Sequence, residues 1–135
     1  MEELIATIQT WMQDGDHIVL GLDANENVRH GSVQKELANI GMYEAIIRHH
    51  PTKSVPVTCN TNESRKPIDR ILTSPGVEVL RCGYLLFDSY DGFSSDHRMV
   101  WVEIDSANIL GHYPHYSSMP SADKVKSNDP RLRDM

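Results

Sequence analysis

The stretch HIVLGLDAN, residues 17–25, decides the fold class of this chain. Residues 17–22 are mostly apolar and rich in branched side chains, a pattern typical of a buried β-strand. The polar loop Asp23-Ala24-Asn25-Glu26-Asn27 follows directly. In an open α/β sheet, ligands bind beyond the carboxyl ends of the strands. The stretch therefore predicts a buried strand that ends at a candidate functional loop.

Helical patterns lie on both sides of this strand. Over residues 2–13, apolar side chains recur at i, i+4 and i+7 spacing and form one stripe. Ser32 can cap a second helix over residues 32–40, where the residues that follow favour helix. Residues 42–50 have a helical or turn-like pattern. We expect the first two helices to cover a sheet.

Three more strands are predicted further along the chain, over residues 68–73, 83–87 and 98–104. The segment 83–87 is apolar on both faces, so we expect it deep in a sheet. Long loops are predicted over 51–67 and 88–95. Together with the two predicted helices, these strands predict an α/β fold.

Length and composition indicate an ordinary globular protein. The chain has 135 residues, 39% of them hydrophobic and 24% charged, which favours one domain. No apolar run approaches the roughly 18 residues that cross a bilayer. The N-terminus lacks the basic start and apolar centre of a signal peptide. We expect an intracellular protein, nuclear or cytoplasmic, that is not secreted and does not contact a membrane.

The net charge and the two cysteines limit the classes of function that the chain can have. The formal net charge of −6 argues against a protein that holds nucleic acid by bulk electrostatics. It does not argue against a nuclease whose carboxylates hold a cation, since a bound cation reverses the local field. Cys59 and Cys82 are far apart and fit neither a zinc motif nor a disulfide framework. Their spacing predicts two reduced thiols.

Residues 105–135 differ in character from the rest of the chain. They are rich in His, Tyr, Ser, Pro, Asp and Lys and contain few aliphatic side chains. Such a segment buries too little apolar surface to offset the entropy lost on ordering. We expect residues 1–104 to form the folded unit and 105–135 to be a flexible tail or linker.

Polar clusters lie beside three of the predicted strands: Asp23-Ala24-Asn25, Asp69, and Ser95-Asp96-His97. Each has an ordinary explanation when it is taken alone. An Asp or Asn after a strand is usually a turn former. A lone His more often satisfies a hydrogen bond than performs catalysis. An Asp within a strand, such as Asp69, is less common because strands disfavour Asp.

Taken in order, these clusters resemble a known superfamily. Gly-x-Asp-x-Asn at 21–25, Ile-Asp-x-Ile-Leu at 68–72 and Ser-Asp-His at 95–97 resemble motifs of the endonuclease/exonuclease/phosphatase superfamily. It includes deoxyribonuclease I, the abasic-site endonucleases and the inositol polyphosphate 5-phosphatases. The resemblance covers residues 16–104, about the C-terminal half of a family domain. It implies half of a four-layer α/β sandwich, a mixed sheet with flanking helices.

The resemblance also implies an activity and a role for each residue. The activity is Mg2+-dependent (or Mn2+-dependent) phosphodiester hydrolysis, foremost by a DNA endonuclease that contacts the phosphate backbone. His97 would take a proton from water or stabilise the charged phosphorane, with Asp69 as its orienting partner. Asp23 would orient the attacking water or assist the leaving oxygen. Asn25 would donate its amide to a phosphate oxygen, and Asp96 would be the magnesium ligand.

Further substrate contacts are expected on the segment before the Asp69 strand. Thr58 lies in the family's connecting segment, and Arg65 and Lys66 lie on the loop where they could touch a phosphate backbone. Solvated loop charges are the alternative for Arg65 and Lys66. For His49-His50, which precede a Pro, we favour a solvated helix end over a metal site.

Departures from the family pattern leave alternatives open. Family members carry an Asn and a magnesium-binding Glu in an N-terminal half, and nothing before Asp23 supplies them. We therefore expect an incomplete site whose partner is that missing half, in a fragment or a decayed gene. Arg70 after the strand Asp resembles the inositol phosphatase branch instead, although Pro67-Ile68 replaces its Trp-Cys. A non-catalytic remnant or interaction module is the other alternative. Residues 127–131 resemble the linker after the endonuclease of some non-LTR retrotransposon polyproteins.

Overall fold

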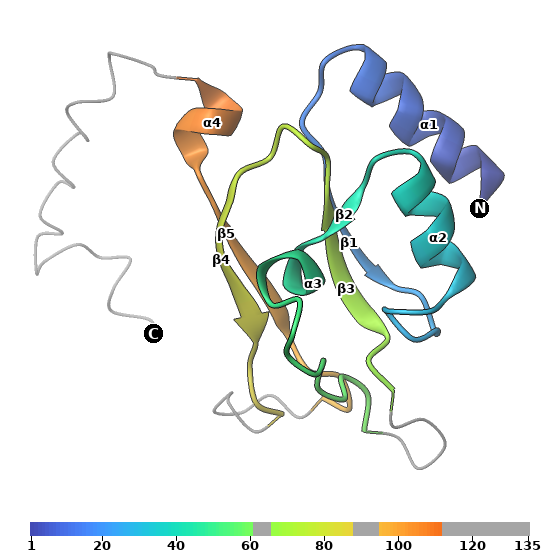
Figure 1. Ribbon diagram of the computed structural model, residues 1–135, viewed down its shortest axis with the longest axis vertical. Helices are drawn as coiled ribbons and strands as arrows, with labels where there is room; N and C mark the ends of the chain where they lie inside the picture. Colours follow the sequence, from blue (N-terminus) through green and yellow to red (C-terminus); the bar gives the residue numbers. More distant parts are fainter. Residues whose placement is uncertain (61–65, 88–94, 112–135) are drawn as a thin grey trace, which may run out of the picture.

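The chain folds as a mixture of helices and strands, so the coarse α/β prediction is confirmed (Figure 1). The computed structural model describes residues 1–60, 66–87 and 95–111. In chain order the elements are α1 (Glu2–Gln13), β1 (Val19–Asp23), α2 (Ser32–Asn39), β2 (Tyr43–Glu44), α3 (Ala45–His49), β3 (Asp69–Thr73), β4 (Val79–Tyr84), β5 (Val100–Ile104) and α4 (Ser106–Leu110).

The strands divide between two small antiparallel sheets. One has three strands in the order β1-β3-β2, and the other is the two-stranded ribbon β4-β5. The predicted mixed sheet is therefore wrong for the described residues, in which every strand pair is antiparallel. The mixed sheet was implied by the family resemblance, whereas in this chain β4 pairs with β5 and not with β3 after the Pro75-Gly76 turn.

The core lies between the three-stranded sheet and two helices. Figure 1 shows α1 and α2 on the same side of this sheet. Ile8 of α1 and Leu37 of α2 are buried against Leu72 of β3, and Leu20 and Leu22 of β1 pack around them. Burying each such side chain contributes roughly 1.5–3 kcal/mol. The apolar stripe predicted over residues 2–13 is thus confirmed as the face that covers the sheet.

Helix α3 joins the two sheets. It contacts both β3 and β4. Ala45 and Ile46 are buried, and the Cys82 thiol of β4 donates a hydrogen bond to the Ala45 carbonyl at 3.5 Å. The predicted helical or turn-like segment at 42–50 is more precisely the short strand β2 followed by α3.

Two boundaries differ from the sequence prediction for identifiable reasons. The strand expected over 83–87 begins and ends earlier, at Val79–Tyr84, because β5 pairs with those residues. Leu86 then lies beyond the ribbon and is 70% exposed, not deep in a sheet. Ser32 does not cap α2, since Gly31 is the N-cap residue. The Glu26 carboxylate caps the start of α2 instead. It accepts hydrogen bonds from the Ser32 hydroxyl and from the backbone N–H of Gln34.

The segment after β5 begins with structure. Asp105 caps α4, because its carboxylate accepts a hydrogen bond from the Ala107 amide. The Asp105 amide also donates to the Glu78 carbonyl at 3.0 Å. The first residues of the expected tail are therefore tied to the ribbon, and residues 112–135 lie outside the described part of the chain. No helix in the described ranges has the length and apolar character to span a bilayer.

Candidate active site

Asp23 and Asp69 meet through the register of the three-stranded sheet. Asp23 ends β1, Asp69 begins β3, and the two residues are direct partners in the antiparallel ladder. Side chains of direct partners lie on the same face, and like charges placed there destabilise the pair. The antiparallel register, and not the carboxyl-end rule for parallel strands, thus brings these carboxylates together. A nearby positive charge would relieve their repulsion.

His97 reaches the same place from a different part of the chain. It forms an isolated antiparallel bridge with Cys59. The Asn60 amide donates to the Asp96 carbonyl at 2.8 Å, and the Arg98 amide donates to the Thr58 carbonyl at 2.7 Å. Residues 58–60 and 96–98 therefore form a short antiparallel ladder that fixes the backbone of His97.

The imidazole of His97 contacts the carboxylate of Asp69. Its Nδ1 lies 3.1 Å from both carboxylate oxygens. Because an ionised carboxylate only accepts, Nδ1 donates, and in the neutral ring Nε2 then carries the lone pair. The two side chains are 34% and 15% exposed, so the pair is open to solvent on the His97 side. The distance expected for an orienting carboxylate is confirmed.

The surroundings of His97 favour its charged form. The hydrogen bond to Asp69 raises the pKa of His97, burial opposes it, and the negative charges of Asp69, Asp23 and Asp96 add to the increase. Carboxylate oxygens of Asp23 and Asp69 and a ring nitrogen of His97 all lie within 4.8 Å of one another. Two acids and one imidazole therefore share one edge of the molecule.

Thr58 supports this edge from inside, and the structure gives it a different role from the expected substrate contact. Its side chain is fully buried. The hydroxyl oxygen accepts hydrogen bonds from the Ile68 amide at 2.9 Å and the Asp69 amide at 3.0 Å. Thr58 therefore holds the start of β3, and with it Asp69, and has no surface to offer a substrate. Tyr84 adds a hydrogen bond to the Asp69 carbonyl at 3.5 Å.

Asn25 lies in a tight turn beside Asp23. Its φ of 53° is in the left-handed region, which Asn tolerates better than most residues. The backbone N–H of Asn25 donates a hydrogen bond to the Asp23 carboxylate at 3.0 Å, and this contact forms an Asx turn. The turn orients the Asp23 carboxylate and leaves the Asn25 side chain exposed. The phosphate contact expected of Asn25 stays a prediction.

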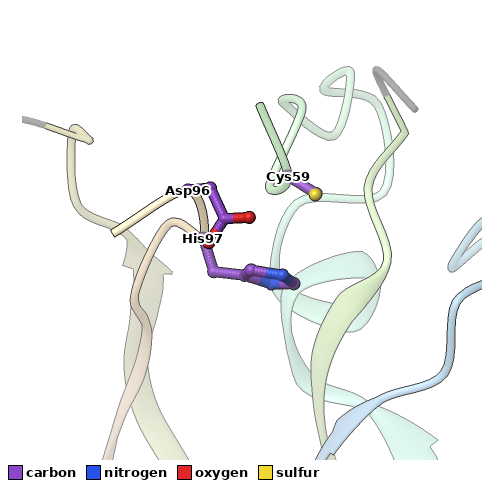
Figure 2. A group of neighbouring side chains, drawn as sticks. All are labelled: Cys59, Asp96 and His97. Carbon is purple, nitrogen blue, oxygen red and sulfur yellow. The ribbon is translucent and has the colours of Figure 1, made fainter. Parts of the chain in front are cut away.

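Three predicted residues remain to be placed: Asp96, Lys66 and Arg65. Asp96 is exposed, and its carboxylate lies within 4.8 Å of ligand atoms of Cys59 and His97 (Figure 2). Lys66 is exposed, and its carbonyl accepts a hydrogen bond from the Thr58 amide at 3.3 Å. Arg65 lies outside the described residues.

Arg70, the neighbour of Asp69, lies on the opposite face. Its side chain is fully buried and lies 3.6 Å from a carboxylate oxygen of Glu26. It also donates to the Glu26 carbonyl at 3.1 Å and to the Gln34 amide oxygen at 3.3 Å. Burial lowers the pKa of Arg70, and the charge of Glu26 opposes that change. Alternation along β3 thus removes Arg70 from the site and gives it a structural role.

Two other histidines do not join the site's hydrogen bonds. His49 is exposed at the end of α3, as expected for a solvated helix end. The His50 Nε2 lies 3.4 Å from the Cys82 carbonyl. A cavity of about 450 Å³ near this helix end is lined by His49 and by residues of the β3–β4 turn, and it includes none of the predicted site residues.

Cys59 is the residue beside the site that sequence reasoning missed. Its spacing from Cys82 was the only property that the sequence offered, and that spacing matches no motif. The neighbours of Cys59 depend on the ladder between 58–60 and 96–98, which brings together segments separated by two strands.

Comparisons of the chain with models of protein families, with characterised proteins and with solved structures gave no significant match.

Proposed function

We propose that this chain takes part in metal-assisted hydrolysis of phosphodiesters, with DNA as the substrate class. The observation that carries the proposal is the contact of His97 Nδ1 with both oxygens of Asp69 at 3.1 Å. A carboxylate that holds one ring nitrogen fixes the tautomer and directs the other nitrogen outward as a proton acceptor. Asp23, the ladder partner of Asp69, supplies a second carboxylate beside the pair.

Each side chain has a defined task in this proposal. Neutral His97 takes the proton of the attacking water at Nε2, and the negative charge of Asp69 stabilises the imidazolium that results. Asp23, oriented by the Asx turn with Asn25, aligns the water or assists the leaving oxygen. Asn25 and Lys66 are both exposed and are proposed to contact the phosphate backbone.

A divalent cation fits the donor chemistry of this edge. A bound Mg2+ or Mn2+ would neutralise the charge of the phosphate. Asp96 offers a hard oxygen ligand, and the repulsion between Asp23 and Asp69 favours a cation nearby. Mg2+ binds proteins through one or two carboxylates together with substrate phosphates. We therefore propose weak retention of Mg2+ until the substrate is bound.

Nicking of a supercoiled plasmid in Mg2+ or Mn2+ tests the proposal. We expect little nicking by the purified chain, even in Mg2+, because few carboxylates are available to hold the cation. His97→Ala should abolish it, whereas His49→Ala, which removes an exposed histidine from the end of α3, should leave it unchanged. Equal nicking by His97→Ala and the unaltered chain would overturn the proposal. An inositol polyphosphate assayed in parallel separates diester cleavage from the phosphomonoesterase alternative.

A further inference from the structure

Cys59, Asp96 and His97 form a second group of metal-binding atoms at the same edge. Figure 2 shows the three side chains together, with the Cys59 sulfur and the Asp96 carboxylate on the same side of the His97 ring. One ligand atom from each residue lies within 4.8 Å of the other two. We propose that these residues bind Zn2+, or another divalent cation that prefers thiolate and imidazole, in competition with Mg2+ for the Asp96 carboxylate.

The donor types decide which metal fits. A thiolate is a soft ligand and an imidazole suits Zn2+, whereas Mg2+ prefers oxygen donors and octahedral geometry. Zinc binds sulfur at about 2.3 Å and nitrogen or oxygen at about 2.0–2.2 Å, which separates tetrahedral ligand atoms by roughly 3.3–3.8 Å. The three ligand atoms lie within 4.8 Å of one another, and a closed zinc site would bring them to the shorter separation. Small side-chain rotations would close that gap.

The backbone holds the ligands in place before a metal arrives. Cys59 and His97 are direct partners in an antiparallel bridge, so their side chains lie on the same face. The hydrogen bonds on either side of the bridge, at 2.8 and 2.7 Å, fix both segments. The His97 amide donates to the Ser95 hydroxyl at 3.1 Å, which bends the chain where Asp96 joins His97. This bend allows Asp96 to share the face that strict alternation would give to His97 alone.

Asp69 supplies the outer support that metal-binding histidines require. With Nδ1 held by the Asp69 carboxylate, Nε2 is the nitrogen left to bind a metal. Carboxylate–histidine–zinc arrangements of this kind fix the ring and raise its basicity. Cys59 is 4% exposed and is not in a disulfide, whereas Asp96 is exposed. The thiol thus closes the inner side of the site, and Asp96 faces the solvent from which the metal enters.

Metal binding here has a consequence for the proposed hydrolysis. The lone pair of His97 Nε2 cannot bind Zn2+ and accept a proton from water at the same time. Zn2+ at this site would therefore inhibit phosphodiester cleavage supported by Mg2+. Inhibition rests on the proposed function, but binding of Zn2+ to Cys59, Asp96 and His97 does not.

Titration of the whole chain with Co2+, used as a spectroscopic substitute for Zn2+, tests the binding step. We expect a thiolate-to-cobalt charge-transfer band in the near ultraviolet, and its loss when Zn2+ displaces Co2+. Cys59→Ser should remove the band and weaken Zn2+ binding on the order of 100-fold. Cys82→Ser is the matched control, because Cys82 is the other buried thiol, and it should leave both unchanged.

Two further variants keep the test decisive if Cys59→Ser does not fold. Asp96→Asn changes only an exposed side chain and should weaken Zn2+ binding about 10-fold or more, as measured by calorimetry. Asp69→Asn removes the outer support and should weaken it about 10–100-fold. Absence of the charge-transfer band in the unaltered chain would overturn the proposal. So would Zn2+ affinity that is the same in Asp96→Asn and the unaltered chain.

The activity arm separates this site from the proposed function. Addition of Zn2+ should suppress plasmid nicking in the unaltered chain, and Cys59→Ser should require a higher Zn2+ concentration for the same effect. If the cobalt band depends on Cys59 but Zn2+ leaves nicking unchanged, the zinc site stands and the proton-acceptor role of His97 is overturned. If nicking is never detected, the binding data still decide whether the site exists.

Discussion

Asp69 and Arg70 are neighbours in β3, yet their two faces of the strand differ in burial and in the partners that they provide. Asp69 contacts the half-exposed ring of His97, a partner that can gain or lose a proton. Arg70 is fully buried against Glu26 and Gln34, partners that tie the sheet to the start of α2. One strand thus carries a structural ion pair on its covered face and a titrating pair on its open face. A charged residue in a strand can therefore have a structural or a titrating role, and the choice depends on which face of the strand its side chain occupies.

Removing Arg70 should have the largest effect on this comparison. Arg70→Ala leaves a cavity and deprives Glu26 of its buried partner, so we expect the free energy of unfolding to fall by about 3 kcal/mol. Urea unfolding measures the loss. Arg81→Ala is the control, because Arg81 pairs with Glu103 on the exposed surface and such pairs contribute about 0–1 kcal/mol. Equal losses in the two variants would contradict the structural role of Arg70.

Removing the hydroxyl of Thr58 should destabilise the start of β3, which carries Asp69. Thr58→Val deprives two backbone amides of their acceptor in a fully buried place, so we expect a loss of about 2 kcal/mol in the free energy of unfolding. Thr7→Val, which removes an exposed hydroxyl that bonds within α1, should cost much less. Thermal unfolding of both variants provides the measurement. Unaltered stability in Thr58→Val would show that Asp69 is not held in this way.

Asp69→Asn sharpens the comparison by weakening the titrating pair alone. The hydrogen bond from His97 to Asp69 is the largest cause of the raised pKa of His97, so the pKa should fall in the variant. A raised His pKa stabilises the fold fully below the ordinary value of about 6.5, and this contribution disappears as the pH rises through the raised value. The stability lost in Asp69→Asn should therefore be greatest at mildly acidic pH, where His97 is charged and a carboxylate still accepts its hydrogen bond, and should become smaller as the pH rises through the raised pKa of His97. NMR titration of His97 gives the pKa directly, and an unchanged value would contradict the contact.

Substitution of Glu44 should have the smallest effect. As with His97, the raised pKa of Glu44 makes its contribution to stability decrease as the pH rises. Burial raises the pKa of Glu44, and hydrogen bonds from α3 oppose the increase. A raised carboxyl pKa gives stability that is fully present below the unfolded value and is lost as the pH rises through the folded one. Glu44→Gln should therefore raise the melting temperature at neutral pH by a few degrees, on the order of 3 °C, and have no effect near pH 4. If Glu44→Gln changed the melting temperature equally at both pH values, burial would not be what destabilises the charged form of Glu44.

The sequence predicted the elements better than their partners. The apolar stripe of residues 2–13 and the branched run before Asp23 are local signals, and both led to the observed helix and strand. Asp69 was conspicuous because Asp is rare in strands, and this anomaly pointed to the site. The register that pairs Asp23 with Asp69 and the bridge between Cys59 and His97 join distant segments. No periodicity within a segment contains that information, which is why neither the antiparallel pairing of the strands nor the place of Cys59 was predicted.

The pairing of Asp23 with Asp69 also couples the register of β1 to the formation of the core. Leu20 and Leu22 face the helices because Asp23 faces the other way. A slip of one residue would send both leucines into water and turn Asp23 toward the core. A chain misaligned in this way would lose the apolar face that covers its core, so it should not fold. Deletions within Val19–Asp23 should abolish folding, whereas substitutions of Val19, whose side chain is exposed, should be tolerated.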